Sequence, residues 1–457
     1  MNLLFLISVI LKGIGAVLEI LLQILITDRL GVGGYGTYSA WINGADLLFW
    51  VFFSGLVKCN TFYLSGAYST IRSFRKHFYL RYVIPVLGVL MLAAAGITGN
   101  GLICFVFVIT ALELTALDRS SILLARGKSN VSLIGEYVLG RATLVLGVLV
   151  LGMLGWLRLE SLLCLYVFQY LLVIGFFLLR QGKSEQPCPD LSAEVSLKKW
   201  GAFQQADLMH AMIEQMPVVL QFFFSGAFEA GVVSIVLLVK KLINFISGPT
   251  AKIFLPEFSR LYHGGKREEI RDCYSSIMRI QMLIVGPLAV VLLAFPRVIL
   301  SILASELVEY DWLFMICSVV FLLAATLGPC GGILQMTGNE KRDNRCRLLA
   351  LGVMGVVMVL TIQDSYFVLY GLCVQVALEA AAKYRCVCRW MGQSPVSLTT
   401  YLKWWVLPCV LIGLSRMLGL GEGFLWMVLM AGTAFAAALW RELRADGGAI
   451  LKKIRKK

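Results

Sequence analysis

Residues 3–27 read LLFLISVILKGIGAVLEILLQILIT, an apolar run that contains only two charged side chains, Lys12 and Glu19. A helix needs about 20 mainly apolar residues to cross the hydrocarbon core of a bilayer. The remainder of the 457-residue chain is similar, because 59% of all residues are hydrophobic and 15% are charged. A soluble domain averages about 25% charged residues. The sequence therefore predicts an all-α integral membrane protein.

A window of this length predicts about fourteen transmembrane helices. They lie near 3–27, 38–64, 82–99, 101–125, 131–154, 159–180, 200–225, 230–256, 277–303, 311–336, 347–363, 366–389, 400–418 and 423–440. The predicted organisation is an N-terminal six-helix bundle at 1–181, a cytoplasmic linker at 182–198, a C-terminal six-helix bundle at 199–391, an extra helix pair at 399–441 and a basic cytoplasmic tail at 442–457.

The positive charges alternate in position along this series of predicted helices. The formal net charge is +14, and nearly all Lys and Arg side chains outside the helices fall in segments on one side. The opposite side holds only Arg29, Arg158, Arg297 and Arg416. Cytoplasmic segments carry such an excess, so both termini are predicted to be cytoplasmic and nucleic acid is not needed to explain the charge. We also expect amphipathic helices at the lipid headgroups over 68–81 and 259–279.

The chain contains an internal repeat. Sliding it by 195 residues places Gly36 on Gly231 and Ser39 on Ser234, and Glu19 falls on Glu214. Each predicted half has six helices, and an even number of crossings returns the chain to the side of the membrane on which it started. The two halves must therefore have the same orientation in the membrane. The sequence thus predicts parallel repeats related by an axis along the membrane normal, with a site near the midplane where they meet.

Three motifs resemble those of a known family, the polysaccharide flippases of the MOP superfamily. That superfamily also holds the MATE multidrug exporters and the lipid II flippase. The motifs are LGVGGYGTY at 30–38, FLPEFSRL at 254–261 followed by GGKREE at 264–269, and GNEK at 338–341. The resemblance covers essentially the first 390 residues, and the last two predicted helices are similar to the extra pair that some members carry.

The resemblance implies two six-helix bundles around a central cavity that opens alternately to either side. It further implies a Wzx-type role in the bacterial cytoplasmic membrane, moving a polyprenyl-pyrophosphate-linked oligosaccharide to the outer leaflet. The expected partners are this lipid-linked substrate, membrane lipids and other membrane proteins of polysaccharide assembly. The motifs are structural signatures and do not identify the sugar.

Charged residues within the predicted helices are the candidate site residues, because a charge at mid-bilayer is unfavourable by roughly 2.5–3.5 kcal/mol. Five cations could bind a pyrophosphate, for which a cationic clamp is the natural partner. They are Lys12, Lys58, Arg141, Lys240 and Lys241. Lys240 and Lys241 are adjacent and point about 100° apart, so at most one faces a cavity squarely.

Acidic and histidine residues in the same helices are candidates for coupling transport to a proton or sodium gradient. They are Glu19, Asp46, Asp207, His210 and Glu214. The alternative interpretation is structural, with ion pairs such as Lys12 with Asp207, or Asp46 with Lys241, locking the helices together. The twelve cysteines lack the spacing of a zinc site, so we expect no metal and no other cofactor.

Two other functions remain open at this stage. A MATE-type antiporter of cations and drugs would have the same fold, and the balance of buried charges does not exclude it. A membrane enzyme of polysaccharide assembly would need catalytic residues on a substantial outer loop, and the predicted outer loops are short. We therefore expect a transporter and not an enzyme.

Overall fold

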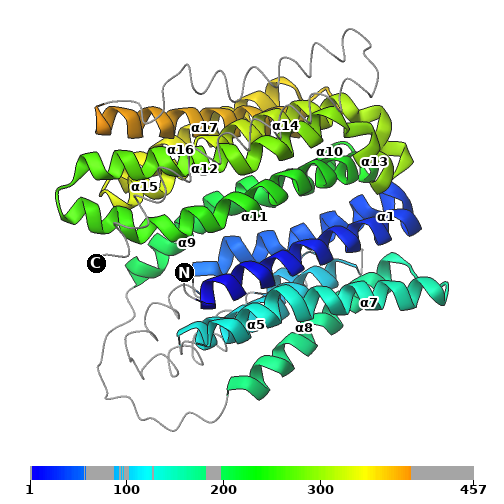
Figure 1. The fold of residues 1–457 in the computed structure, drawn as a ribbon. Coiled ribbons are helices and arrows are strands. Elements are labelled where there is room, and N and C mark those ends of the chain that lie inside the picture. The colour runs from blue at the N-terminus through cyan, green and yellow to red at the C-terminus, as the bar shows by residue number, and fades with distance from the viewer. Residues whose placement is uncertain are drawn as a thin grey trace. The chain divides into compact units, whose positions relative to one another are not determined.

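The computed structural model describes residues 3–55, 57, 87–91, 94, 96, 102–125, 128–181 and 197–392. Every regular element in these residues is a helix (Figure 1). The residues divide by their contacts into two compact units, Met1–Ser234 and Ile235–Lys457, and each is described by itself. The boundaries predicted for the two bundles stay a prediction. Several other predictions lie outside the described residues, namely Lys58, the helix at 68–81, most of the span at 82–99 and of the linker, the extra helix pair and the basic tail.

The first unit begins with α1, Leu3–Phe52, which contains the first predicted span and the part of the second that lies before residue 53. Gly31 divides it into a first limb (3–30) and a second limb (32–52), because its φ of 72° and ψ of 173° are not helical. Glycine adopts this region without a steric penalty. The remaining elements are α5 Ile103–Ala125, α6 Ser129–Leu133, the π-helix η2 Ile134–Leu139, α7 Gly140–Met153, α8 Leu159–Gln181, α9 Leu197–Glu214, α10 Met216–Phe224 and the start of α11 Ala227–His263.

The second unit contains most of α11 and the elements that follow it. These are α12 Arg267–Ala294, α13 Pro296–Leu303, the 3₁₀-helix η3 Ser305–Tyr310, α14 Asp311–Thr326, α15 Cys330–Met336, α16 Glu340–Leu360 and α17 Phe367–Met391. Helix α17 packs against α14, α15 and α16.

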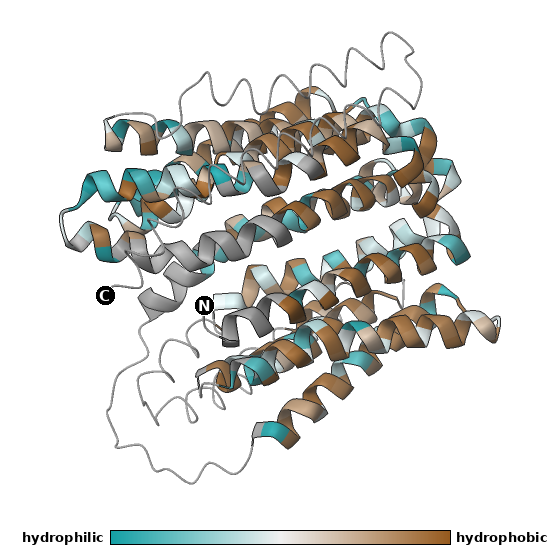
Figure 2. Ribbon diagram, viewed as in Figure 1, coloured by the Kyte–Doolittle hydropathy of each residue, from teal (hydrophilic) through white to brown (hydrophobic). Residues whose placement is uncertain are grey.

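Five described segments are long and apolar enough to cross a membrane. They are Ile10–Phe52, Asn130–Met153, Leu159–Arg180, Ser305–Met336 and Phe367–Met391. Helix α8 is apolar along most of its length, with hydrophilic colours near its ends (Figure 2). Large apolar side chains on these surfaces are exposed, for example Met153 and Leu179 at 86% each. A bilayer would cover them, so the prediction of a multi-pass membrane protein is supported, whereas the count of fourteen and the side of each terminus stay predictions.

Residues 195 positions apart meet each other inside the first unit. The hydroxyl groups of Ser39 and Ser234 form a buried hydrogen bond of 2.7 Å. A Cβ atom added to Gly36 would collide with the carbonyl oxygen of Ala227, and one added to Gly231 would collide with that of Val32. Val32 and Ala227 are themselves 195 residues apart, so the contact is reciprocal. Such reciprocity is what a local two-fold axis between the two segments requires.

The same offset relates the two glycines at which these segments begin. Gly31 has a φ of 72°, and Gly226, which lies between α10 and α11, has a φ of 119°. Both are positions where a residue with a Cβ atom would be strained. The repeat predicted from the sequence is therefore expressed in the backbone conformation as well as in the contacts.

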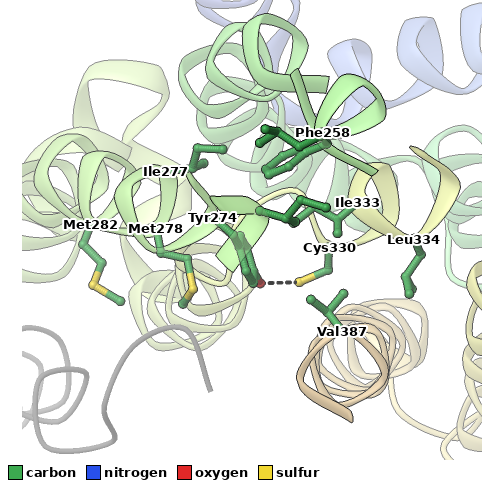
Figure 3. Close-up of a cluster of buried hydrophobic side chains, with 11 residues drawn as sticks. Phe258, Tyr274, Ile277, Met278, Met282, Cys330, Ile333, Leu334 and Val387 are labelled. Atoms are coloured by element: carbon green, nitrogen blue, oxygen red, sulfur yellow. Dashed lines mark hydrogen bonds between the residues drawn. The ribbon is translucent and has the colours of Figure 1, made fainter. Parts of the chain in front are cut away.

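The second unit has a core where the sequence predicted a helix lying at the headgroups. The prediction of one amphipathic helix over 259–279 is wrong, because α11 ends at His263, a turn follows with Gly265 at φ 70°, and α12 begins at Arg267. The apolar side chains of this segment are buried in one cluster with α15 and α17 (Figure 3). The cluster comprises Phe258, Leu261, Ile270, Tyr274, Ile277, Met278, Met282, Cys330, Ile333, Leu334 and Val387.

Gly36 offers a test of the close contact in the first unit. We expect Gly36→Ala to destabilise the protein strongly, because the added methyl group meets backbone that cannot move away. Gly44→Ala, on the same limb, is the matched control, since nothing lies within 4 Å of its Cβ position. Alanine there should be neutral or stabilising by about 0.5–1 kcal/mol. Thermal unfolding in detergent measures both, and equal melting temperatures would contradict the contact.

Tyr274 tests the core of the second unit. Its hydroxyl group donates a hydrogen bond of 2.6 Å to the carbonyl oxygen of Leu327 and lies 3.0 Å from the Sγ of Cys330. Tyr274→Phe should lower the free energy of unfolding by about 1 kcal/mol, since one hydrogen bond is lost. Tyr274→Ala should lower it by about 3–5 kcal/mol, because it also leaves a cavity. A melting temperature that is the same in the two variants would show that the ring is not packed as described.

Candidate functional site

The first limb of α1 packs closely on η2, and this contact positions three of the predicted site residues. A Cβ atom on Gly15 would stand 2.8 Å from the carbonyl oxygen of Tyr137. Lys12 and Glu19 lie three residues before and four after Gly15, on the same face of the helix. They therefore flank the point of closest approach. Lys12 meets Tyr137 of η2, and Glu19 meets Arg141, which follows η2 at the start of α7. We refer to this contact as the α1–η2 seam.

Both cations at the seam have acidic neighbours. The Nη1 of Arg141 forms an ion pair with the Oε2 of Glu19. The Nζ of Lys12 lies 5.5 Å from the centre of the Tyr137 ring, a distance typical of cation–π contacts, and within electrostatic range of Glu136. The structure thus brings together Lys12, Glu19 and Arg141, which the sequence assigned to two different roles.

The π-helix η2 explains why Arg141 reaches the seam. A π-helix inserts an extra residue into a turn, so the residues after it are rotated by about 100° from the positions in a continuous α-helix. Such insertions often occur at functional sites. Two glycines bracket the element and allow close packing, Gly135 against the ring of Phe177 and Gly140 against the side chain of Gln169. These glycines are the only sequence signal that could have indicated the irregularity.

Four tyrosines surround the ion pair, and the sequence analysis missed all of them. The rings form a chain, with centroid separations of 6.5 Å from Tyr35 to Tyr38, 6.3 Å from Tyr38 to Tyr166 and 5.5 Å from Tyr166 to Tyr170. Arg141 interacts electrostatically with all four of them. Tyr35, Tyr38 and Tyr166 are each less than a tenth exposed. Aromatic rings at helical spacing are hard to distinguish from ordinary core residues in a sequence.

Asp46 lies on the second limb, where its side chain hydrogen-bonds with that of Glu113 on α5. Glu113 lies in the middle of the span predicted at 101–125, and it was not among the candidate site residues. The structure buries it to 6% exposure. The pair Asp46–Glu113 is thus a feature that the sequence did not predict.

The predicted coupling residues Asp207, His210 and Glu214 lie on α9, which packs against α1. Asp207 is buried at 3% exposure, and the ring of His210 meets the ring of Trp50 edge to face at 5.6 Å. A third side chain fixes α9 in place. The amide of Gln204 donates hydrogen bonds of 2.6 Å to the carbonyl oxygens of Trp50 and Val51, near the end of α1. Whether this face lines a cavity stays a prediction.

Lys240 and Lys241 lie on α11 in the second unit. Lys240 is buried at 8% exposure, whereas Lys241 is exposed, which agrees with the expected divergence of the two side chains. Lys240 interacts electrostatically with Cys373 on α17. Their predicted contact with substrate is not tested by this arrangement.

A buried charge network in the second unit also went unpredicted. The Nζ of Lys383 lies 2.6 Å from Asp343 and 2.7 Å from Glu379, and the Nε of Arg347 lies 3.3 Å from Glu379. Asp343 is fully buried and accepts a further hydrogen bond of 2.8 Å from Gln335. Two cations and two anions balance, so we interpret the network as a structural tie between α15, α16 and α17.

No group of three or more His, Cys, Asp or Glu side chains that could hold a metal ion occurs among the described residues. Within the same residues, the α1–η2 seam holds the strongest concentration of predicted candidates. It has two cations, Lys12 and Arg141, the carboxylates of Glu19 and Glu136, and several tyrosines. Guanidinium and ammonium groups in this setting can bind an anionic headgroup, and the tyrosine hydroxyl groups can hydrogen-bond to it.

Comparison with known proteins shows what the fold resembles. No family model matches the chain, and no curated protein matches it in sequence. Solved structures do match. An inward-facing multidrug resistance MATE family transporter of the MOP superfamily gives a TM-score of 0.65 at 11% identity, covering 85% of this chain and 98% of its own. The lipid II flippase MurJ in an inward closed conformation gives a TM-score of 0.62 at 12% identity. The match covers 97% of this chain and 99% of the flippase.

A further structural match is a MOP superfamily transporter from Pyrococcus furiosus, described as having a binding pocket of reverse polarity. It gives a TM-score of 0.52 at 12% identity and covers 86% of this chain and 95% of its own. Identities this low establish a shared fold and nothing about substrate. The fold expected from the sequence motifs is thus supported.

The ion pair at the seam can be tested by a double-mutant cycle. Glu19→Gln and Arg141→Gln should each destabilise the protein, because each leaves a partly buried charge without its partner. The double variant should be more stable than the sum of the single effects predicts, by about 0.5–3 kcal/mol. Thermal unfolding in detergent measures all four proteins. Additive effects would show that the two side chains do not interact.

Proposed function

We propose that this protein is a transporter that flips a polyprenyl-pyrophosphate-linked oligosaccharide across the bacterial cytoplasmic membrane by alternating access. The observation that carries the proposal is the α1–η2 seam, where Lys12 and Arg141 lie on facing elements beside hydrogen-bonding tyrosines. Cationic side chains bind pyrophosphate, and arginine is favoured because its fork matches phosphate oxygens.

The structural comparisons support a transporter, and the extent of the match differs between the two kinds of transporter. The lipid II flippase covers nearly the whole chain, whereas the MATE transporter covers 85% of it. Lipid II, named in the description of that flippase, is a lipid-linked molecule. The charge asymmetry of the sequence supports cytoplasmic termini, with release of the substrate on the outer side.

The second candidate function is a MATE-type antiporter of cations and drugs. The highest TM-score among the matches above belongs to a MATE transporter. The carboxyl groups of Glu19, Asp46 and Glu113 could attract a cationic substrate or hold the coupling ion. An enzyme of polysaccharide assembly is less well supported, because the fold matches transporters and flippases. Coupling to a proton or sodium gradient remains part of the proposal.

A gene deletion in the native host separates the two transport functions. Flippase activity predicts loss of surface polysaccharide, together with accumulation of polyprenyl-linked sugars inside the cell. Extraction of these lipids and a stain for surface glycan measure both. Intact glycan with new sensitivity to dyes and cationic drugs would instead assign the protein to the antiporters.

Within that assay, Arg141→Ala and Lys12→Ala should abolish glycan export while the protein remains in the membrane. Lys266→Ala is the matched control, because Lys266 is exposed and pairs only at the surface with Glu269, at 2.7 Å. Immunoblotting of membranes confirms that each variant is present. Normal export in both test variants would remove the proposed pyrophosphate clamp.

A further inference from the structure

The cation best placed to bind a phosphate group already has an internal anion. Arg141 and Glu19 form an ion pair whose side chains are 34% and 19% exposed. The pair is thus partly open to an incoming molecule. A guanidinium group binds carboxylate and phosphate oxygens through the same planar fork. Glu19 therefore occupies the donors that a substrate phosphate would need.

We propose that Glu19 is an exchangeable counterion, which holds Arg141 in the empty carrier and is displaced by the pyrophosphate group of the substrate. This inference rests on the proposed function. The exchange keeps a negative group against Arg141 in both the empty and the loaded states. That matters because a charge left in low dielectric without a partner is strongly unfavourable.

The surroundings of Arg141 show why an internal counterion is needed. Its other electrostatic neighbours are the hydroxyl groups of five tyrosines, which are neutral at physiological pH. They are Tyr35, Tyr38, Tyr137, Tyr166 and Tyr170. Asp46 also acts on Tyr38 and Tyr166, but its side chain hydrogen-bonds with Glu113. Glu136 accepts a hydrogen bond from Ser120 and lies within range of Lys12. Among the described residues, Glu19 is the carboxylate that forms an ion pair with the guanidinium group of Arg141.

The exchange gives Glu19 a role in the return step of a transport cycle. An alternating-access carrier must change conformation both with and without its substrate. The empty protein would have to bury a bare guanidinium group, and the pair with Glu19 avoids this. Removing the carboxylate should therefore strengthen substrate binding while slowing net transport. A purely structural ion pair would not produce this combination, because its loss would weaken both.

The test measures binding of farnesyl pyrophosphate, with farnesol as the uncharged comparison, to the purified full-length protein by titration calorimetry. Glu19→Gln should bind the pyrophosphate about tenfold more tightly than the unchanged protein, and Glu19→Asp should be intermediate because its shorter side chain pairs less well. Arg141→Gln should bind about tenfold more weakly, and the double variant should match it. Glu160→Gln, at an exposed position near the start of α8, is the control. Size-exclusion profiles confirm folding.

The outcomes separate the two proposals. Tighter binding by Glu19→Gln together with reduced glycan export in cells supports the exchange. Unchanged or weaker binding by Glu19→Gln, with Arg141→Gln still impaired, overturns the exchange and leaves the flippase function in place. If the unchanged protein and Arg141→Gln bind farnesyl pyrophosphate no better than farnesol, the pyrophosphate clamp fails and the exchange fails with it.

Discussion

The close contact of Gly36 with Ala227, and of Gly231 with Val32, is the constraint on which the arrangement of the first unit depends. Backbone can approach backbone this closely only where no side chain intervenes, and small residues serve this purpose in membrane helices. The hydrogen bond between Ser39 and Ser234 continues the same contact. With the second limb held here, its remaining residues are placed for Tyr38 and Asp46 to face α5 and α8.

The unfavourable energy of a charge in hydrocarbon organises the polar groups of both units. In the first unit, Arg141 is matched by Glu19; in the second, Lys383 and Arg347 are matched by Asp343 and Glu379. The two arrangements differ in burial. The network in the second unit is almost sealed, with Lys383 at 6% exposure, whereas the pair in the first unit is partly open. This difference in burial favours a structural role for the network in the second unit, and it is consistent with the binding role proposed for the pair in the first unit.

The sequence predicted the helical membrane class and the repeat, because both depend on periodic features of many residues. It also selected Lys12, Glu19 and Arg141, since charges in apolar runs are conspicuous. It could not predict that Arg141 meets Glu19, because that contact depends on the extra residue per turn in η2. The tyrosines and Glu113 were missed for a related reason. Their importance arises from contacts with residues that are distant in the sequence. The segment 259–279 was misassigned for a different reason, because amphipathic spacing is typical of helices in a buried core as well as of helices on a lipid surface.

The reciprocal glycine contact has a consequence for the origin of the chain. Two identical copies of a half-length ancestor, associating about a two-fold axis, would have made this same contact as a homodimer, with each mutation appearing on both sides at once. Joining the two copies in one gene would have allowed a mutation to appear in one copy without appearing in the other. Equivalent positions now carry opposite charges, Lys12 against Asp207 and Asp46 against Lys241, which a symmetric dimer could not have encoded. Gene fusion thus allowed the two copies to become complementary to each other while the glycines at the axis stayed the same.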